Sequence, residues 1–128
     1  MQRAAPVGLI WERMRFQSSE LGGKFRSLLL ESIDETVRGV LGEGPLKAMF
    51  YSLEKYLGVS RGEIPERLED FQNGLVTLFG RSAAPIISRA IVRNLCGKLE
   101  IPYQRSDYDF KTYIEECRRK YGEREGRR

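Results

Sequence analysis

Residues 49–80 read MFYSLEKYLGVSRGEIPERLEDFQNGLVTLFG, and this stretch decides the fold. Two apolar patterns occur in it, and both repeat with the period of an α-helix. The first contains Phe50, Leu53 and Tyr56, and the second contains Leu68, Phe71, Leu75, Leu78 and Phe79. Each pattern is followed by a glycine, Gly58 or Gly80. We therefore expect two amphipathic helices, each of which needs a partner surface for its apolar side.

Helical patterns also lie on both sides of this stretch. Upstream, the apolar positions are Phe25, Leu28, Leu29, Ile33, Val37, Val40 and Leu41, followed by Gly42, Gly44 and Pro45. Downstream they are Ile87, Ala90, Ile91 and Leu95, and then Phe110, Tyr113, Ile114, Cys117 and Tyr121. No segment alternates with the period of a strand. The sequence predicts an all-α fold, a compact bundle of about five to six amphipathic helices with short loops.

Glycine, proline and capping residues predict where these helices begin and end. Breaks are expected at Gly22–Gly23, Gly42, Gly58, Gly80, Gly97 and Gly122, and helix starts at Lys24, Pro45, Pro65, Ser82 and Ser106. Ser60 and Glu63 have the spacing of a capping box. We expect a short helix in an N-terminal segment over 1–23, a helical domain over 24–121 and a basic mobile tail over 122–128.

The segment YSLEKYLGVSRGEIPERLEDFQNGLVTLFG, followed by IISRAIVRNLCGKLEIPY, resembles the archaeal Nitrosopumilus output domain family, in particular the fifth member of that set. The matching features are the aromatic-LEK-aromatic helix from Tyr51 to Tyr56, Gly58, Glu63-Ile64-Pro65, Phe71, Phe79-Gly80 and the aliphatic helix from Ile86 to Leu95. The similarity covers about residues 24–103. Where family members often carry a glycine-alanine pair, this chain has Arg81-Ser82-Ala83-Ala84. The resemblance implies a signalling output and brings no catalytic residues with it.

Composition narrows the class of function. The chain has 128 residues, which suits one domain, and it contains no histidine and only two cysteines. Without histidine the chain lacks the usual general base and the commonest metal ligand, so we expect a non-catalytic protein without a cofactor. No apolar run approaches the length of a membrane span, and no secretory signal is visible. We expect a cytoplasmic protein with no membrane partner.

Positive charge is concentrated in two places. Residues 118–128 hold six basic and two acidic side chains, and the segment from Arg81 to Lys98 contains no acid. The candidate contacts for an anion or nucleic acid are Arg81, Arg89, Arg93, Arg118, Arg119, Lys120, Arg124, Arg127 and Arg128. The alternatives are a solvated arginine face paired with acids of a neighbouring helix, and a tail that only improves solubility.

Two smaller clusters allow a metal-site interpretation and a plainer one. Glu31, Asp34 and Glu35 are a carboxylate cluster or a charged helix surface with an Asp34–Arg38 pair. Cys96 and Cys117, with Glu115 and Glu116, are a soft-metal site or two small buried residues. We favour the plainer interpretation of both clusters and predict no metal site.

The N-terminal segment carries Ile10, Trp11 and Met14 at helical spacing after Val7. These residues are candidates for docking to a partner groove, and packing back onto the bundle is the alternative. The leading hypothesis is a non-catalytic helical interaction module, a regulatory or signalling output domain of archaeal type, with another protein or a second copy as partner. The alternative is a basic accessory protein that binds nucleic acid or a ribonucleoprotein particle.

Overall fold

The computed structural model describes the backbone of residues 4–103 and 109–126 and the side chains of residues 23–103 and 109–125. The elements in chain order are α1 (Ala4–Leu41), α2 (Glu43–Leu57), the 3₁₀-helix η1 (Arg61–Glu66), α3 (Leu68–Leu99) and α4 (Phe110–Gly126). Within the described backbone there is no strand. The predicted all-α bundle is confirmed.

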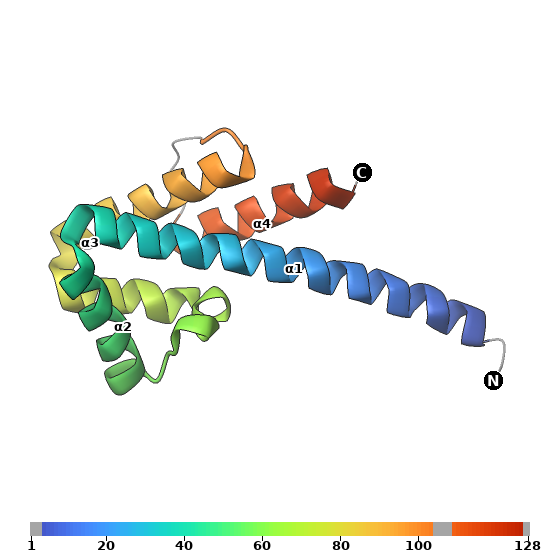
Figure 1. The fold of residues 1–128 in the computed structure, drawn as a ribbon, viewed down its shortest axis with the longest axis horizontal. Helices are drawn as coiled ribbons and strands as arrows, with labels where there is room; N and C mark the ends of the chain where they lie inside the picture. The colour runs from blue at the N-terminus through green and yellow to red at the C-terminus, as the bar shows by residue number, and fades with distance from the viewer. Residues whose placement is uncertain (1–3, 104–108, 127–128) are drawn as a thin grey trace.

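Helix α1 is the centre of the bundle and packs against α2, η1, α3 and α4 (Figure 1). Phe25, Leu29, Ile33 and Val37 follow one another every four residues, so they fall on one side of α1, and all four are almost fully buried. Other fully buried side chains come from every remaining element; they include Met49, Leu53, Ile64, Phe71, Leu75, Ile91, Leu95, Leu99 and Ile114. The hydrophobic core therefore joins all five elements.

Helix α3 consists of two halves that meet at Gly80. This glycine has φ 91° and ψ 165°, which are not helical values and which an L side chain rarely adopts. Figure 1 shows the chain turning back where the two halves of α3 meet. The hydroxyl of Ser88 in the second half donates to the Gln72 side chain in the first half, at 2.5 Å. The predicted helix end at Gly80 is thus correct, because the first half of α3 ends there and the chain changes direction.

The turn from α2 to α3 confirms two sequence predictions and corrects one. Gly58 is left-handed with φ 67° and ends α2, and Ser60 with Glu63 forms a capping box at the start of η1. The prediction that Pro65 opens the next helix is wrong, because Pro65 lies inside η1 and α3 begins at Leu68. The Arg67 guanidinium donates to the carbonyl oxygens of Gly58 and Leu57 near the end of α2.

Three predicted helix ends are wrong. Helix α1 continues through Gly22–Gly23, α3 continues through Gly97 to Leu99, and α4 continues through Gly122 to Gly126. Glycine costs a helix about 1 kcal/mol relative to alanine, and neighbouring turns can supply that amount. The predicted start at Ser106 lies outside the described residues, and the α4 helix itself begins at Phe110.

Most of the predicted core is confirmed, including Phe71 and Leu75 at 0% exposure. Five side chains of the helical apolar patterns are instead exposed: Val40, Leu41, Tyr56, Leu57 and Leu78. Each lies near the end of its helix or half-helix, where no neighbouring element covers it. The apolar pattern continues in the sequence after the partner surface has ended.

Helix α3 is long and apolar enough to cross a membrane by length and composition alone, contrary to the expectation that no such stretch exists. It contributes twelve buried residues to the bundle and changes direction at Gly80. A third of its most apolar window is buried in the bundle, so core packing accounts for part of the apolar character of α3.

Candidate interaction surface

A small hollow with an apolar lining opens at the surface between α2 and the first half of α3. Its volume is about 90 Å³. The lining residues are Ser52, Leu53, Tyr56 and Leu57 from α2 and Gly74, Thr77 and Leu78 from α3. These seven residues are called the α2–α3 groove below.

The floor of the groove depends on Gly74, which is buried and has no side chain. A Cβ atom at this position would overlap Leu53 Cδ2 and would lie 3.2 Å from Leu57 Cδ1. Leu53 is 1% exposed and fills the space that a larger residue at position 74 would need. Glycine therefore allows α2 and α3 to approach closely at this level.

The rim of the groove presents hydrophobic side chains to solvent. Tyr56 is 70% exposed, Leu57 39% and Leu78 37%. Lys55 extends over the rings of Tyr51 and Tyr56, with its Nζ 5.4 and 5.3 Å from the two ring centroids. The sequence analysis placed Tyr56 and Leu78 in the core and attached no function to Gly74. A glycine inside a helical pattern is the one sequence signal that points to this surface.

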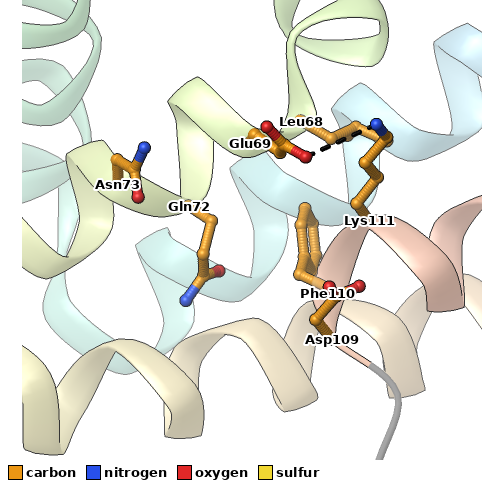
Figure 2. A pocket seen from close by; sticks show the side chains of 7 residues that line it. All are labelled: Leu68, Glu69, Gln72, Asn73, Asp109, Phe110 and Lys111. Carbon is orange, nitrogen blue, oxygen red and sulfur yellow. Dashed lines mark hydrogen bonds and ion pairs between the residues drawn. The ribbon is translucent and has the colours of Figure 1, made fainter.

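A larger cavity of about 260 Å³ lies between the beginnings of α3 and α4 (Figure 2). The residues that line it are Leu68, Glu69, Gln72, Asn73, Asp109, Phe110 and Lys111. Phe110 is buried and its ring centroid lies 5.7 Å from that of Phe71, so it belongs to the core. Lys111 Nζ lies 3.5 Å from the Glu69 carboxylate. Sequence reasoning did not identify this cavity.

Two polar groups of this cavity already have structural partners. The Asp109 carboxylate accepts the backbone N–H of Thr112 at 2.8 Å, which holds the pKa of Asp109 below its ordinary value. The Gln72 side-chain oxygen accepts the hydroxyl of Ser88. An ionised helix cap and an amide bonded to a hydroxyl are poor candidates for general acid or base catalysis.

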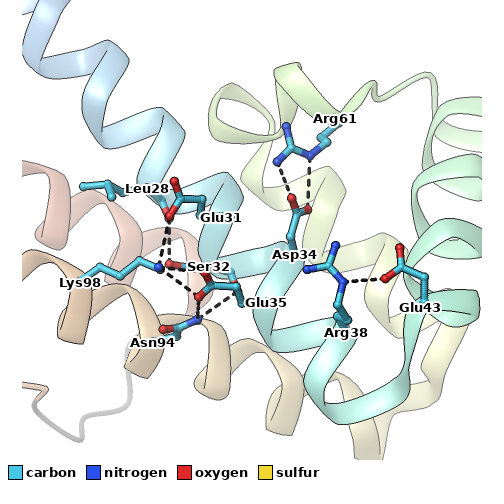
Figure 3. Close-up of polar contacts among 10 residues, drawn as sticks. All are labelled: Leu28, Glu31, Ser32, Asp34, Glu35, Arg38, Glu43, Arg61, Asn94 and Lys98. Atoms are coloured by element: carbon cyan, nitrogen blue, oxygen red, sulfur yellow. Dashed lines mark hydrogen bonds and ion pairs between the residues drawn. The ribbon is translucent and has the colours of Figure 1, made fainter.

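Cations from other elements hold Glu31, Asp34 and Glu35 of α1 (Figure 3). Lys98 of α3 lies between Glu31 and Glu35, with N–O distances of 3.3 and 3.0 Å. Asp34 accepts two hydrogen bonds from the Arg61 guanidinium, at 3.3 and 2.6 Å. The side chains described contain no group of three or more potential metal ligands. The charged-surface interpretation of these residues therefore has the better support.

The partner predicted for Asp34 is wrong. Arg38 Nε lies 2.6 Å from Glu43 across the bend between α1 and α2, while Asp34 binds Arg61 (Figure 3). For Asp34 the sequence analysis considered only a partner within the same helix, and the tertiary structure offers a closer one. The hydrogen bond from Lys98 is the main reason that the pKa of Glu35 lies below its ordinary value.

Arg81, Arg89 and Arg93 are exposed on the second half of α3. Across the side chains described, none of the three has an ion-pair partner, so the predicted pairing with acids of a neighbouring helix finds no support there. The Arg93 guanidinium instead lies 5.2 Å from the ring centroid of Tyr103, which stacks on Tyr113. This arginine row keeps its charge available to solvent.

The basic residues after Cys117 behave differently from the arginine row. Arg118 lies over the Phe25 ring and donates to the Pro65 carbonyl oxygen. Arg119 pairs with Glu116 and Glu123. Arg118 helps to pack α4 on the bundle, and Arg119 is occupied by two acids of its own helix, which weakens the prediction that they bind nucleic acid.

The end of α4 is also tied to the bundle. Arg124 pairs with Glu125 and donates to the Glu100 carbonyl oxygen, and Tyr121 is 3% exposed. Lys120 is half-buried, and Arg127 and Arg128 lie outside the described residues. A truncation after Cys117 would remove the basic residues and also the buried Tyr121, so it could not separate a role of the basic residues in binding from damage to the core.

The predicted docking residues Ile10, Trp11 and Met14 lie in the N-terminal part of α1, where the structure describes the backbone alone. In Figure 1 this part of the helix extends beyond the bundle, with no other helix beside it. The structure therefore brings Ile10, Trp11 and Met14 onto one helix but places no described element of the same chain against it.

Cys96 of α3 and Cys117 of α4 are brought together, although they are 21 positions apart. Their Sγ atoms are 3.8 Å apart, and each residue is 4% exposed. Both thiols are free.

Comparison with protein-family models, curated proteins and solved structures finds no match for this chain. The similarity to the archaeal Nitrosopumilus output domain family stays a prediction that rests on the residues quoted for it.

Proposed function

We propose that this protein is a non-catalytic interaction module that binds an amphipathic helix in the α2–α3 groove, and that a second copy supplies this helix from the N-terminal part of α1. The observation that carries the proposal is the groove itself. Tyr56, Leu57 and Leu78 expose hydrophobic surface around an apolar hollow, and burial of such surface is the main favourable term in helix-in-groove binding.

The projecting part of α1 suits the role of the occupant. Helix α1 has 38 residues, and the first buried side chain that the structure describes on it is Phe25. Val7, Ile10, Trp11 and Met14 have the spacing of one helix side, and an apolar side of this kind needs a surface to cover it. The apolar N-terminal segment and the α2–α3 groove belong to the same chain. Two copies can therefore each place this segment in the groove of the other, which covers both apolar surfaces.

A finer proposal is that this module is a regulatory or signalling output of archaeal type in the cytoplasm. Its support is the resemblance of residues 24–103 to the archaeal family, together with the absence of histidine from the sequence. On this proposal the groove transmits a signal by binding, and no chemical step is involved.

The experiment compares two tyrosine variants. Tyr56→Ala removes a groove side chain, and Tyr51→Ala removes a tyrosine of similar exposure that does not line the groove. Sedimentation velocity over a range of protein concentrations should show association in the parent protein and in Tyr51→Ala, and much weaker association in Tyr56→Ala. Trp11 is the only tryptophan, so its emission on dilution reports the occupant directly. A monomer at every concentration, or equal association in both variants, would refute the proposal.

The exposed arginine row favours a second candidate function, nucleic-acid binding. Arg81, Arg89 and Arg93 are without ion-pair partners in the described part of the chain, and the aromatic ring of Tyr103 lies beside Arg93. Arginine with a neighbouring aromatic ring is a usual combination for phosphate and base contacts. Reversal of two charges, Arg89→Glu with Arg93→Glu, should abolish such binding, whereas Arg119→Glu should not. Loss with both, or a binding constant independent of salt, would argue against this function.

A further inference from the structure

Two buried thiols from different helices lie in direct contact. Cys96 Sγ of α3 and Cys117 Sγ of α4 are 3.8 Å apart, the distance of a thiol hydrogen bond. A disulfide needs an S–S distance of about 2.05 Å, so the sulfur atoms must approach by about 1.8 Å. Side-chain rotation and a small shift of α4 toward α3 can share this movement. The remaining requirement is a reactive sulfur.

The surroundings make the two sulfur atoms unequal. At 3.8 Å either thiol can donate its S–H to the other sulfur. When Cys117 donates, this hydrogen bond lowers the pKa of Cys96 to about 7, helped by the nearby Lys120 ammonium and opposed by burial. The same hydrogen bond and burial raise the pKa of the Cys117 thiol. Cys96 is therefore the nucleophile of the pair, because the thiolate is the reactive form, and Cys117 is placed to react second.

We propose that Cys96 and Cys117 are a redox-sensitive modification site, which a small hydroperoxide such as hydrogen peroxide converts to an intramolecular disulfide. The Cys96 thiolate attacks one peroxide oxygen, the O–O bond breaks, and hydroxide leaves and takes up a proton to become water. Cys96 is then a sulfenic acid. The Cys117 sulfur attacks the Cys96 sulfur, the S–S bond forms, the S–O bond breaks, and a second water leaves with the Cys117 proton. The two sulfurs together lose two electrons, and the peroxide gains them.

The consequence of this cross-link is structural. It ties α3 to α4 and closes the chain between positions 96 and 117 into a loop, which limits the freedom of the unfolded chain. Oxidation should therefore stabilise the docking of α4, and a dithiol reductant should reverse the effect. The site is independent of the α2–α3 groove, since neither cysteine lines it.

The test uses the whole protein and dilute hydrogen peroxide. After quenching, the oxidised protein should be lighter by two hydrogen atoms in intact-mass analysis, and thiol titration in denaturant should fall from two groups to none. Its melting temperature should rise by about 10 °C, estimated from a loop of this length. Dithiothreitol should restore the original mass and melting temperature.

Two single variants test the order of the steps. In Cys117→Ala the Cys96 sulfenic acid has no thiol to react with, so dimedone should trap it, and alkylation of Cys96 by iodoacetamide should need a higher pH. In Cys96→Ala the remaining thiol should react with peroxide much more slowly. The proposal is overturned if the parent protein keeps both thiols under conditions that oxidise free cysteine. It is also overturned if the parent gains oxygen atoms without losing hydrogen, or forms only intermolecular disulfides. The parent protein decides these outcomes even if a variant fails to fold.

Discussion

Leu53 occupies the space that a Cβ atom on Gly74 would take. The Leu53 side chain is almost fully buried, and its Cδ2 atom lies inside the contact distance of an atom built at that position. Because Leu53 is in the middle of α2 and Gly74 is in the first half of α3, this one relationship sets how closely the two helices pack. It also sets the depth of the groove between them.

Gly74→Ala is expected to destabilise the fold by about 1–3 kcal/mol, because the added methyl group would overlap Leu53 Cδ2 and crowd Leu57 Cδ1, so the packing between α2 and α3 would have to shift. The matched control is Gly97→Ala, another substitution within α3, where nothing lies within 4 Å of the added methyl group. That control should stabilise the protein by about 0.5–1 kcal/mol through helix propensity. Urea unfolding followed by circular dichroism measures both. Equal effects of the two substitutions would mean that α2 and α3 do not approach closely at Gly74.

Phe71→Ala should cost about 3–5 kcal/mol of unfolding free energy, the range for a fully buried phenylalanine. Phe71 is 0% exposed, and its ring lies against that of Phe110 at the start of α4. The control is Tyr51→Ala, which removes an aromatic ring that is 61% exposed and should change stability by less than about 0.5 kcal/mol. A loss below about 1 kcal/mol for Phe71→Ala would place that ring outside the core.

Deletion of residues 1–19 should weaken self-association and leave the melting temperature nearly unchanged. In Figure 1 no other helix lies beside the N-terminal part of α1, and the deletion removes none of the buried side chains that the structure describes, which begin at Phe25. Mean helicity should fall only by the share of the removed helical turns. Light scattering and thermal melting measure the two properties on the same sample. A sharp drop in melting temperature would show instead that the segment packs on its own bundle.

The Asp109 carboxylate should make stability depend on pH in the acidic range. Its folded-state pKa lies below the ordinary value of 3.8, because the ionised form accepts the Thr112 N–H at the start of α4. A lowered folded-state pKa means that this contribution is fully present well above pH 3.8 and is lost as the pH falls below that value.

Asp109→Asn and Asp109→Ala separate charge from capping. Asparagine keeps an oxygen that caps the helix, so that variant should stay close to the parent near neutral pH and lose less stability on acidification. Alanine removes the cap and should cost about 0.5–2 kcal/mol at neutral pH. Denaturant melts from pH 7 to pH 3 measure both effects. A parent-like acid profile for Asp109→Asn would show that the carboxylate does not contribute.

Local chemistry accounts for the predictions that were confirmed. Helical period in the apolar residues is enough to predict helices, and a change from Gly58 or Gly80 to any L side chain would be strained at the observed positive φ values. The capping box of Ser60 and Glu63 forms between residues three apart. These features need no information from distant parts of the chain.

The wrong predictions share a different cause. Gly97 and Gly122 were expected to end helices, yet each helix continues past its glycine at a cost that the bundle can absorb. Tyr56 and Leu78 follow their apolar patterns and are still exposed, because a pattern does not show where the partner surface ends. Asp34 binds Arg61 across 27 positions, and no rule based on helical spacing could select that partner.

By itself, the sequence determined the helical class, the turns at Gly58 and Gly80, and the identity of most core positions. The reason is that period, capping and backbone conformation are properties of neighbouring residues. Only the tertiary structure decided which charges pair, that Cys96 and Cys117 touch, and that a groove opens beside Gly74. Those features depend on where segments far apart in the chain meet, and the way the helices fill space together determines those meeting points.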